Sequence, residues 1–277
     1  MALSTALTTD SALTKLGSNA GTLALENGAS LTTSVGLTNS STTEVDYFGS
    51  TGGSSLTIGG ALTNNSLLDI GNTSLTKATT VTAASVTNSG TFELISGTAA
   101  ATLKVTGAFG STDFVEVDTS GAGGSKLTIG GTLTNGGTFE VGNPGLSKAT
   151  TVTAAGLSST GTIYLSGGTS TPATLDITAA APATLTANFN LSGDSLLEFA
   201  SGGITAIGSG VLTLNGATAL VALSSATTTN SALKGLASNA GNFNIADGAA
   251  LTTTISFTNT GLAAVDGNSY GGAEAAV

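Results

Sequence analysis

Carboxylate side chains recur along this sequence at an almost constant spacing. The series is Glu44, Asp69, Glu93, Glu116 and Glu140, at steps of 25, 24, 23 and 24 residues, and it continues with Tyr164. Carboxylates held side by side repel one another, which raises their pKa values or attracts cations. The spacing therefore predicts either a solvated acidic face or a strip that binds Ca²⁺, although the chain lacks the glycine-rich nonapeptides that bind calcium in other repeat proteins.

The neighbouring residues indicate which way these carboxylates point. Each lies between two inward positions of an alternating run, as Glu93 lies between Phe92 and Leu94. Side chains alternate across a strand, so the apolar neighbours would face a core and the carboxylates would all face outward. We therefore expect Phe92 and Phe139 to be buried in one column and Glu93 and Glu140 to be exposed.

Asparagine occupies a second recurrent position. Asn39, Asn64, Asn88, Asn135 and Asn259 each end a short alternating run. In stacked strands such side chains can form a hydrogen-bonded ladder, at a turn where asparagine tolerates the left-handed conformation. We expect a structural role for this series.

The residues that would position these side chains repeat with a period of about 24. One expected inner column holds Ile58, Val81, Val105, Ile129, Val152 and Ile177, a second Leu62, Val86, Phe109, Leu133 and Leu157, and a third Leu68, Phe92, Val115, Phe139 and Ile163. Within each run the apolar residues alternate with polar ones, which is the two-residue period of a strand. Stacked coils would place the members of a column about 4.8 Å apart in the interior.

Two longer repeats enclose this period. Residues 52–97 match residues 123–168 at 26 of 46 positions, and residues 2–46 match residues 222–266 at 23 of 45. Such self-similarity is typical of a repeat architecture. The predicted organisation is one continuous β-solenoid over residues 1–277, with related terminal segments (1–46 and 222–266) and related internal repeats (52–122 and 123–194).

Three segments depart from the pattern. The period breaks between Ala179 and Leu196, where Pro182 removes a backbone donor, and this predicts a longer coil or an outward loop. The related stretches that start at Asp10 and Asn230 each begin with a residue suited to a helix N-cap and space Leu at i and i+3. These two stretches are compatible with either a short helical turn or a loop.

Composition excludes several classes of function. The chain has 6 basic residues, all Lys, against 16 acidic ones, and a net charge of −10. It therefore has little with which to bind a phosphate backbone, so we expect no nucleic-acid partner, and anionic membrane surfaces are disfavoured too. No apolar run approaches the ~18 residues of a membrane helix, so no membrane insertion is expected.

Several reactive residue types are missing. The sequence contains no Cys, His, Arg or Trp, which removes disulfides, thiolate chemistry and the usual zinc ligands. We expect no cofactor other than Ca²⁺ at the acidic series. The composition fits a secreted bacterial protein, and residues 1–13 show no charged and apolar segments of a secretion signal.

The pattern LTIGGTLTNGGTFEVG at residues 127–142 resembles the strand repeats of bacterial autotransporter passenger domains and two-partner-secretion exoproteins. The resemblance covers nearly the whole chain and concerns architecture more than activity. It implies a right-handed parallel β-helix on a cell surface, serving adhesion, autoaggregation or biofilm formation. The fold expected is thus all-β, a single right-handed parallel β-helix of about eleven coils, roughly 50 Å long.

Two alternatives were weighed against this structural role. β-Helix polysaccharide lyases and glycosidases exist, but they use Arg, Lys or His around an acidic sugar, so we expect no enzyme here. Ice binding would need an unbroken outward threonine array. The column expected to carry it consists of Thr57, Thr80, Lys104, Thr128, Thr151 and Asp176, which two charged residues interrupt.

The ends of the solenoid predict how it associates. Terminal coils leave unpaired strand edges, which pair with other chains unless something covers them. The 220-residue repeat makes the last coils similar to the first ones, and a contact of that kind does not close on itself. We therefore expect head-to-tail self-association, with a host or matrix glycan or protein as a further partner and an extracellular or bacterial cell-surface location.

Overall fold

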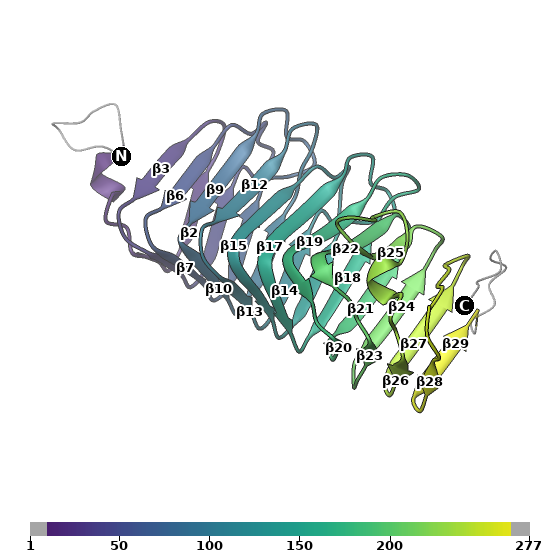
Figure 1. The fold of residues 1–277 in the computed structure, drawn as a ribbon. Coiled ribbons are helices and arrows are strands. Elements are labelled where there is room, and N and C mark those ends of the chain that lie inside the picture. Colours follow the sequence, from purple (N-terminus) through teal and green to yellow (C-terminus); the bar gives the residue numbers. More distant parts are fainter. Residues whose placement is uncertain (1–9, 267–277) are drawn as a thin grey trace.

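Parallel strands stack into a β-solenoid in the computed structural model, which describes residues 10–266 (Figure 1). Successive strands of a wall come from successive coils, so that Phe92 lies beside Leu68 on one side and Val115 on the other. The predicted all-β class and the period of about 24 residues are confirmed. The right-handed sense of the coil stays a prediction.

The longest unbranched wall is an 11-stranded sheet that runs from one end of the described chain to the other. Its strands are β2 (Thr22–Leu25), β5 (Thr42–Val45), β8 (Leu67–Ile70), β11 (Thr91–Leu94), β14 (Phe114–Val117), β16 (Thr138–Val141), β18 (Thr162–Ser166), β21 (Asn188–Ser192), β24 (Val211–Asn215), β27 (Asn242–Ala246) and β29 (Leu262–Val265). They alternate apolar and polar residues, and the apolar positions face the core. This wall carries the acidic series.

A 14-stranded sheet forms the other two walls. One arm consists of β3 (Ser30–Thr33), β6 (Ser55–Ile58), β9 (Thr79–Ala83) and β12 (Ala101–Val105), and the other of β1 (Ser18–Asn19), β4 (Leu37–Asn39), β7 (Ala61–Asn64), β10 (Ser85–Asn88) and β13 (Phe109–Ser111). Both arms pair with the long strand β15 (Lys126–Asn135), after which β17 (Thr150–Ser159), β19 (Ala173–Ala181), β22 (Ser195–Gly202) and β25 (Ala219–Leu223) follow. At β15 the corner between the two walls becomes part of one bent strand.

Glycine makes this corner possible. A Cβ atom on Gly59 would lie 2.7 Å from the backbone oxygen of Thr33, and one on Gly60 would lie 2.7 Å from the backbone nitrogen of Gly36. Neither distance leaves room for a side chain, because the neighbouring coil passes too close. The two glycines therefore allow adjacent coils to stack at the corner.

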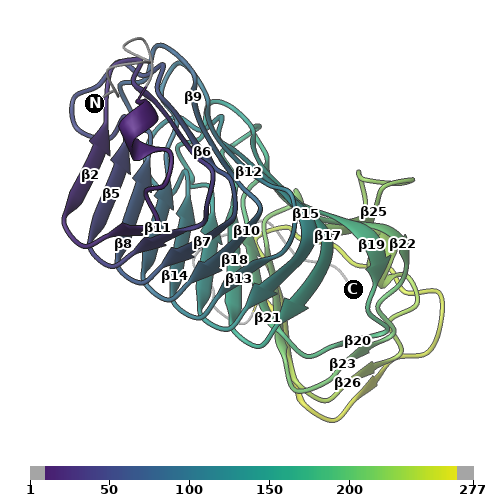
Figure 2. The ribbon, with the colours of Figure 1, turned by 90° about the vertical axis from the view of Figure 1, so that its left-hand side faces the viewer.

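The solenoid widens in its second half (Figure 2). From the first strand of a coil to the 11-stranded wall the chain advances 12 residues at Thr150 to Thr162, but 15 at Ala173 to Asn188. The extra residues form a separate 4-stranded sheet made of β20 (Thr184–Leu185), β23 (Ala206–Ile207), β26 (Ser238–Asn239) and β28 (Thr258–Asn259). The predicted break after Ala179 is thus a longer coil.

Apolar columns fill the interior. Phe92, Phe109 and Phe139 are fully buried and pack edge to face, with ring centroids 5.8 Å apart for the first pair and 6.3 Å for the second. This geometry suits the quadrupoles of aromatic rings. The burial of Phe92 and Phe139 in one column is confirmed.

One of the predicted inner columns is wrong in register. Val81 lies beside Leu56 and not beside Ile58, and Val152 lies beside Leu127 in that same column. Because side chains alternate with a period of two, a slip of two residues keeps both valines inside. Coils of unequal length cause the slip, and the turns absorb the difference.

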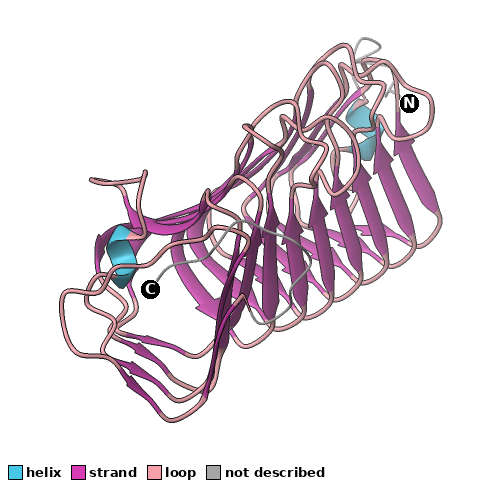
Figure 3. Cartoon of the chain, turned by 90° about the vertical axis from the view of Figure 1, so that its right-hand side faces the viewer, coloured by secondary structure: helices cyan, strands magenta, loops and turns pink. Residues whose placement is uncertain are grey.

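Short 3-10 helices occupy the two irregular stretches near the ends (Figure 3). They are η1 (Ser11–Leu13) and η2 (Ser231–Leu233), and neither has the side-chain N-cap that the sequence suggested. The Asn230 side chain instead accepts the backbone N–H of Val221 at 2.8 Å, and the Ser231 hydroxyl accepts that of Leu223 at 2.8 Å. Helix η2 therefore covers the edge of β25.

Candidate functional site

The five carboxylates lie on the outer face of the 11-stranded wall, in successive strands. Strand pairing places Glu44 beside Asp69, Asp69 beside Glu93, Glu93 beside Glu116, and Glu116 beside Glu140. We call this series the acidic ladder. Tyr164 follows Glu140 in register, as the spacing predicted.

The expectation that the acidic ladder is exposed is wrong. Glu44 is 7% exposed and Asp69 is 1% exposed, and Glu93 and Glu140 are half-buried. Tyr47 is the physical reason for the burial at one end, because its side chain lies against Asp69 and Glu93 and its hydroxyl hydrogen-bonds to Glu93. The outward side chains are thus covered by a turn that follows β5.

Burial changes the protonation of this cluster. Desolvation, then repulsion from Glu93, Glu44 and Glu116, raises the pKa of Asp69 to about 7. Desolvation and the neighbouring carboxylates raise the pKa of Tyr47 to about 12. The pKa values of Glu44, Glu93 and Glu140 are raised as well, first by burial and then by a neighbouring carboxylate.

The acidic ladder has features that favour a cation and one that does not. Both carboxylate oxygens of Asp69 are buried without a hydrogen-bond partner, which is costly for an ionised group. However, no three Asp or Glu side chains within residues 10–266 converge in a geometry ready to hold a metal ion. The binding of Ca²⁺ by the acidic ladder, Glu116 included, stays a prediction.

Sequence reasoning missed a second type of carboxylate site, inside the solenoid. Asp46 is fully buried, and its Oδ2 accepts the backbone N–H of Ser54 at 2.7 Å and the hydroxyl of Thr79 at 2.6 Å. Its Oδ1 accepts the hydroxyls of Ser50 and Ser54 at 2.6 and 2.8 Å. The only sequence signal is an aspartate directly after a strand, and its φ of 56° lies in the left-handed region.

Asp118 repeats this arrangement in the second internal repeat. Its Oδ2 accepts the backbone N–H of Ser125 at 2.7 Å and the hydroxyl of Thr150 at 2.6 Å. Around Asp118 desolvation outweighs the hydrogen bonds and raises the pKa, whereas around Asp46 the hydrogen bonds outweigh desolvation and lower the pKa. With every oxygen satisfied, both groups act as clamps between coils and leave no open ligand position.

The asparagines form a ladder through the second wall. Nδ2 of Asn19 donates to Oδ1 of Asn39 at 2.9 Å, Asn39 donates to Asn64 at 2.8 Å, and Asn64 donates to Asn88 at 2.7 Å. The same amides also donate to backbone oxygens of the next coil, as Asn64 does to Thr91 at 2.9 Å. Each side chain thereby bonds one coil to the next.

Two apolar residues interrupt this asparagine ladder. Asn135 donates to the hydroxyl of Ser159 at 3.3 Å, after which the column continues in the 4-stranded sheet with Leu185 and Ile207. The ladder then resumes at Asn239. The interruption coincides with the widening of the solenoid.

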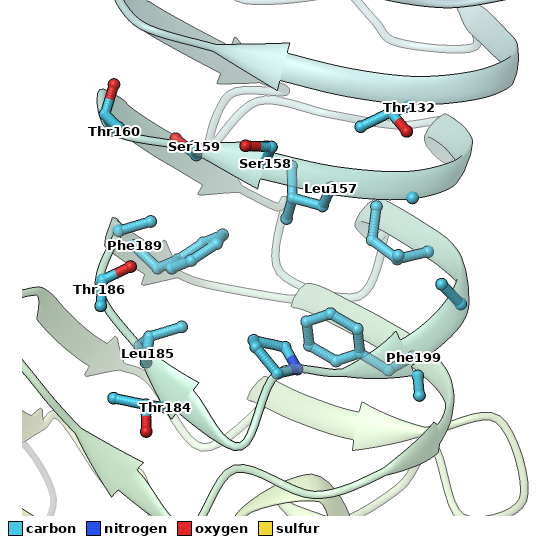
Figure 4. Close-up of a pocket in the computed structure, with 16 residues that line it drawn as sticks. Thr132, Leu157, Ser158, Ser159, Thr160, Thr184, Leu185, Thr186, Phe189 and Phe199 are labelled. Atoms are coloured by element: carbon cyan, nitrogen blue, oxygen red, sulfur yellow. The ribbon is translucent and has the colours of Figure 1, made fainter.

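A cavity of about 510 Å³ lies at this step (Figure 4). Leu157, Phe189 and Phe199 form its apolar part, and the hydroxyls of Ser159 and Thr184 lie on opposite sides of it. The pairing of β17 with β19 ends at Ala154 and Ile177, so the last residues of β17 form a strand edge at this cavity. Such a space suits a small apolar group ringed by hydroxyls.

The outward threonines occupy a column different from the one predicted. Strand pairing aligns Thr32, Thr57, Thr82, Lys104, Thr128, Thr153, Asp176 and Glu198. The register slip at Val81 explains why Thr80 and Thr151 do not belong to it. Three charged side chains interrupt this array, which makes it a poor match to a regular lattice of water.

Comparisons with protein families, with curated proteins and with solved structures found no match to this chain. Among residues 10–266 there is no helix with the length and apolar character needed to span a membrane.

Proposed function

We propose that this chain is a structural building block which stacks end to end with further copies of itself. The supporting observation is that the chain already contains one such junction. Residues 222–266 are similar to residues 2–46, and this C-terminal unit sits on the coil before it through parallel pairing of β26 with β23 and of β27 with β24. The N-terminal unit has the same kind of strand edge to offer.

The last coil of the described chain is the surface on which a second copy would sit. Inner positions that are covered in earlier coils are open here, since Phe243 and Ile245 are buried while Ala263 and Val265, beside them in β29, are exposed. Asn259 is exposed as well, although Asn239 in the coil before is fully buried. Strand edges of this kind pair with another chain when one is supplied.

The spacing of residues at the two ends is compatible. Asn259 precedes Leu262 by three positions, and Asn19 precedes Thr22 by three. A second copy that places its Asn19 over Asn259 therefore also places β2 over β29, with Leu25 over Val265. The asparagine ladder and the 11-stranded wall would both continue across the junction.

The location is proposed on the sequence alone. The resemblance to autotransporter passenger and two-partner-secretion strand repeats, and the absence of cysteine from the sequence, support a bacterial cell-surface or matrix filament. In this role the solenoid is an adhesin stalk or a filament subunit, and it is not an enzyme.

Electron microscopy and light scattering of the purified chain test the proposal. We expect rods longer than one solenoid, with a mass that increases with concentration. The double variant Ala263→Lys and Val265→Lys places two charges on the stacking surface and should give single solenoids. A wild-type chain that stays a monomer at high concentration would overturn end-to-end stacking.

A matched control separates this effect from a general charge effect. Thr112→Lys and Thr128→Lys add the same charge at exposed positions on the side walls, and this variant should still form rods. Circular dichroism checks that both variants fold. If both lose the rods equally, charge repulsion and not the end surface would explain the result.

A further inference from the structure

A groove of about 480 Å³ lies on the outer face of the 11-stranded wall, where the acidic ladder ends. Strand pairing places Glu140, Tyr164, Asn190 and Thr213 side by side on its floor, in four successive coils. At the usual spacing of parallel strands these four side chains extend over about 14 Å. The groove is therefore long enough for an extended chain of small units.

A rigid turn forms one wall of the groove. Nδ2 of Asn143 donates to the backbone oxygens of Asp118 at 2.7 Å and Gly121 at 3.1 Å, and its Oδ1 accepts the N–H of Gly145 at 2.7 Å. These bonds fix Pro144, which lines the groove, before any ligand arrives. A wall held in this way loses little entropy on binding.

The first internal repeat shows what keeps the groove open. Tyr47 and Thr119 each follow a left-handed aspartate, and each lies next to the acidic ladder. Tyr47 covers Asp69 and Glu93, whereas the short Thr119 side chain donates to Glu116 at 2.8 Å and lines the open groove. The larger side chain fills in one repeat the space that stays empty in the other.

The chemistry of the lining fits a sugar. The Tyr164 ring is 41% exposed and offers an apolar face to the C–H groups of a sugar ring. The Asn190 amide supplies a donor and an acceptor, Thr213 a hydroxyl, and Glu140 an acceptor. The Asn215 side-chain oxygen, also in the lining, has no hydrogen-bond partner within residues 10–266.

Charge decides which sugars fit. No lysine lines the groove, and the remaining carboxylates of the acidic ladder lie in line with its end, so an anionic sugar would be repelled. We propose that this groove binds a neutral oligosaccharide, with Tyr164 stacked against a sugar ring and Glu140 and Asn190 hydrogen-bonded to hydroxyls. This proposal does not depend on end-to-end stacking.

Binding to immobilised short oligosaccharides tests it. The probes are neutral gluco-, manno-, galacto- and N-acetylglucosamine oligomers beside oligouronates of the same length. We expect binding to at least one neutral series, weak or no binding to the oligouronates, and a loss of affinity of roughly tenfold or more in Tyr164→Ala and in Asn190→Ala. Tyr164→Phe keeps the ring and should bind like the wild type.

Phe48→Ala serves as the control, because Phe48 is 70% exposed and is not in the lining of the groove. This variant should bind as the wild type does. Binding that is absent for every neutral probe, that survives Tyr164→Ala, that falls equally in Phe48→Ala, or that is strongest for oligouronates would overturn the proposal. Rods seen by electron microscopy in the same variants show that stacking is unaffected.

Discussion

The hydroxyl of Thr79 donates to the carboxylate of Asp46 at 2.6 Å, across 33 residues of sequence. Both groups are fully buried, so Thr79→Val leaves a buried carboxylate with one donor fewer. Hydrogen bonds to charged groups contribute roughly 1.5–3 kcal/mol. We expect Thr79→Val to lower the free energy of unfolding by that amount in a denaturant titration.

Thr80→Val is the matched control. Thr80 is the next residue along β9, and its side chain faces solvent, so its substitution should change stability by less than about 0.5 kcal/mol. Equal effects of the two substitutions would contradict the clamp at Asp46. Thr150→Val, at the Asp118 clamp, should resemble Thr79→Val.

The aromatic column gives a second prediction. Phe139→Ala removes a fully buried ring that packs against Phe109, and such truncations cost about 3–5 kcal/mol. Phe139→Asp should destabilise further, because it buries a charge without a partner. A thermal melt unchanged by either substitution would contradict the inner column, and Phe48→Ala should leave the melt unchanged.

Substitution in the asparagine ladder gives a third prediction. Asn64→Ala removes the donor to Asn88 and the acceptor for Asn39, and we expect a loss of about 2–3 kcal/mol. Asn64→Ser should cost less, since serine occupies the ladder naturally at Ser111 and accepts from Asn88. The neighbouring Asn65 is exposed, so Asn65→Ala should have little effect in the same chemical denaturation experiment.

Stability should fall as the pH rises through the range in which Asp69 titrates. Burial and the carboxylates Glu93, Glu44 and Glu116 raise the pKa of Asp69 to about 7, and Tyr47 also faces it. An unfolded aspartate has a pKa of about 3.9, so between these values the folded state holds more protons than the unfolded state. Unfolding titrations should show a loss on the order of 2–4 kcal/mol between about pH 4 and pH 7, and little further change above pH 7 from this group.

Asp69→Asn removes this titration. The variant should be more stable than the wild type at pH 8 and should show a flatter dependence on pH. Asp113→Asn alters an exposed carboxylate outside the acidic ladder and should keep the wild-type slope. A wild-type stability that rises between pH 4 and pH 7 would contradict the raised pKa.

Calcium offers a separate test of the acidic ladder. If Ca²⁺ occupies it in the folded state alone, millimolar Ca²⁺ should raise the melting temperature at pH 8. The combined substitutions Asp69→Asn, Glu93→Gln and Glu116→Gln should abolish that rise. Calorimetry that detects no heat of Ca²⁺ binding, together with an unchanged melt, would leave Asp69 to be neutralised by a proton.

The sequence was sufficient to predict the solenoid, because inward residues recur in every coil. The column from Leu68 to Phe139 and the asparagine series could be aligned by counting alone. The inner column at Val81 could not, since a shift of two residues keeps the same side inward and leaves the pattern equally apolar. Only the strand pairing distinguishes the two registers.

The covered part of the acidic ladder was beyond a reading of the periodic pattern. Alternation correctly placed Asp69 outside its wall, but Tyr47, which buries it, lies in a turn that has threonine in the other repeat. The groove beside Tyr164 is formed by Thr119, Pro144 and Asn190, which are far apart in the sequence. Non-periodic residues decide both sites, and a period contains no information about them.

The asparagine ladder also gives the solenoid a direction. Every amide between Asn19 and Asn88 donates toward the C-terminal side and accepts from the N-terminal side, and the bond from Asn239 to Asn259 points the same way. Aligned amide dipoles leave excess donor character at one end and acceptor character at the other. Two copies meeting through identical ends would oppose donor to donor, so an assembled fibre would be polar, with two chemically different tips that can grow at unequal rates.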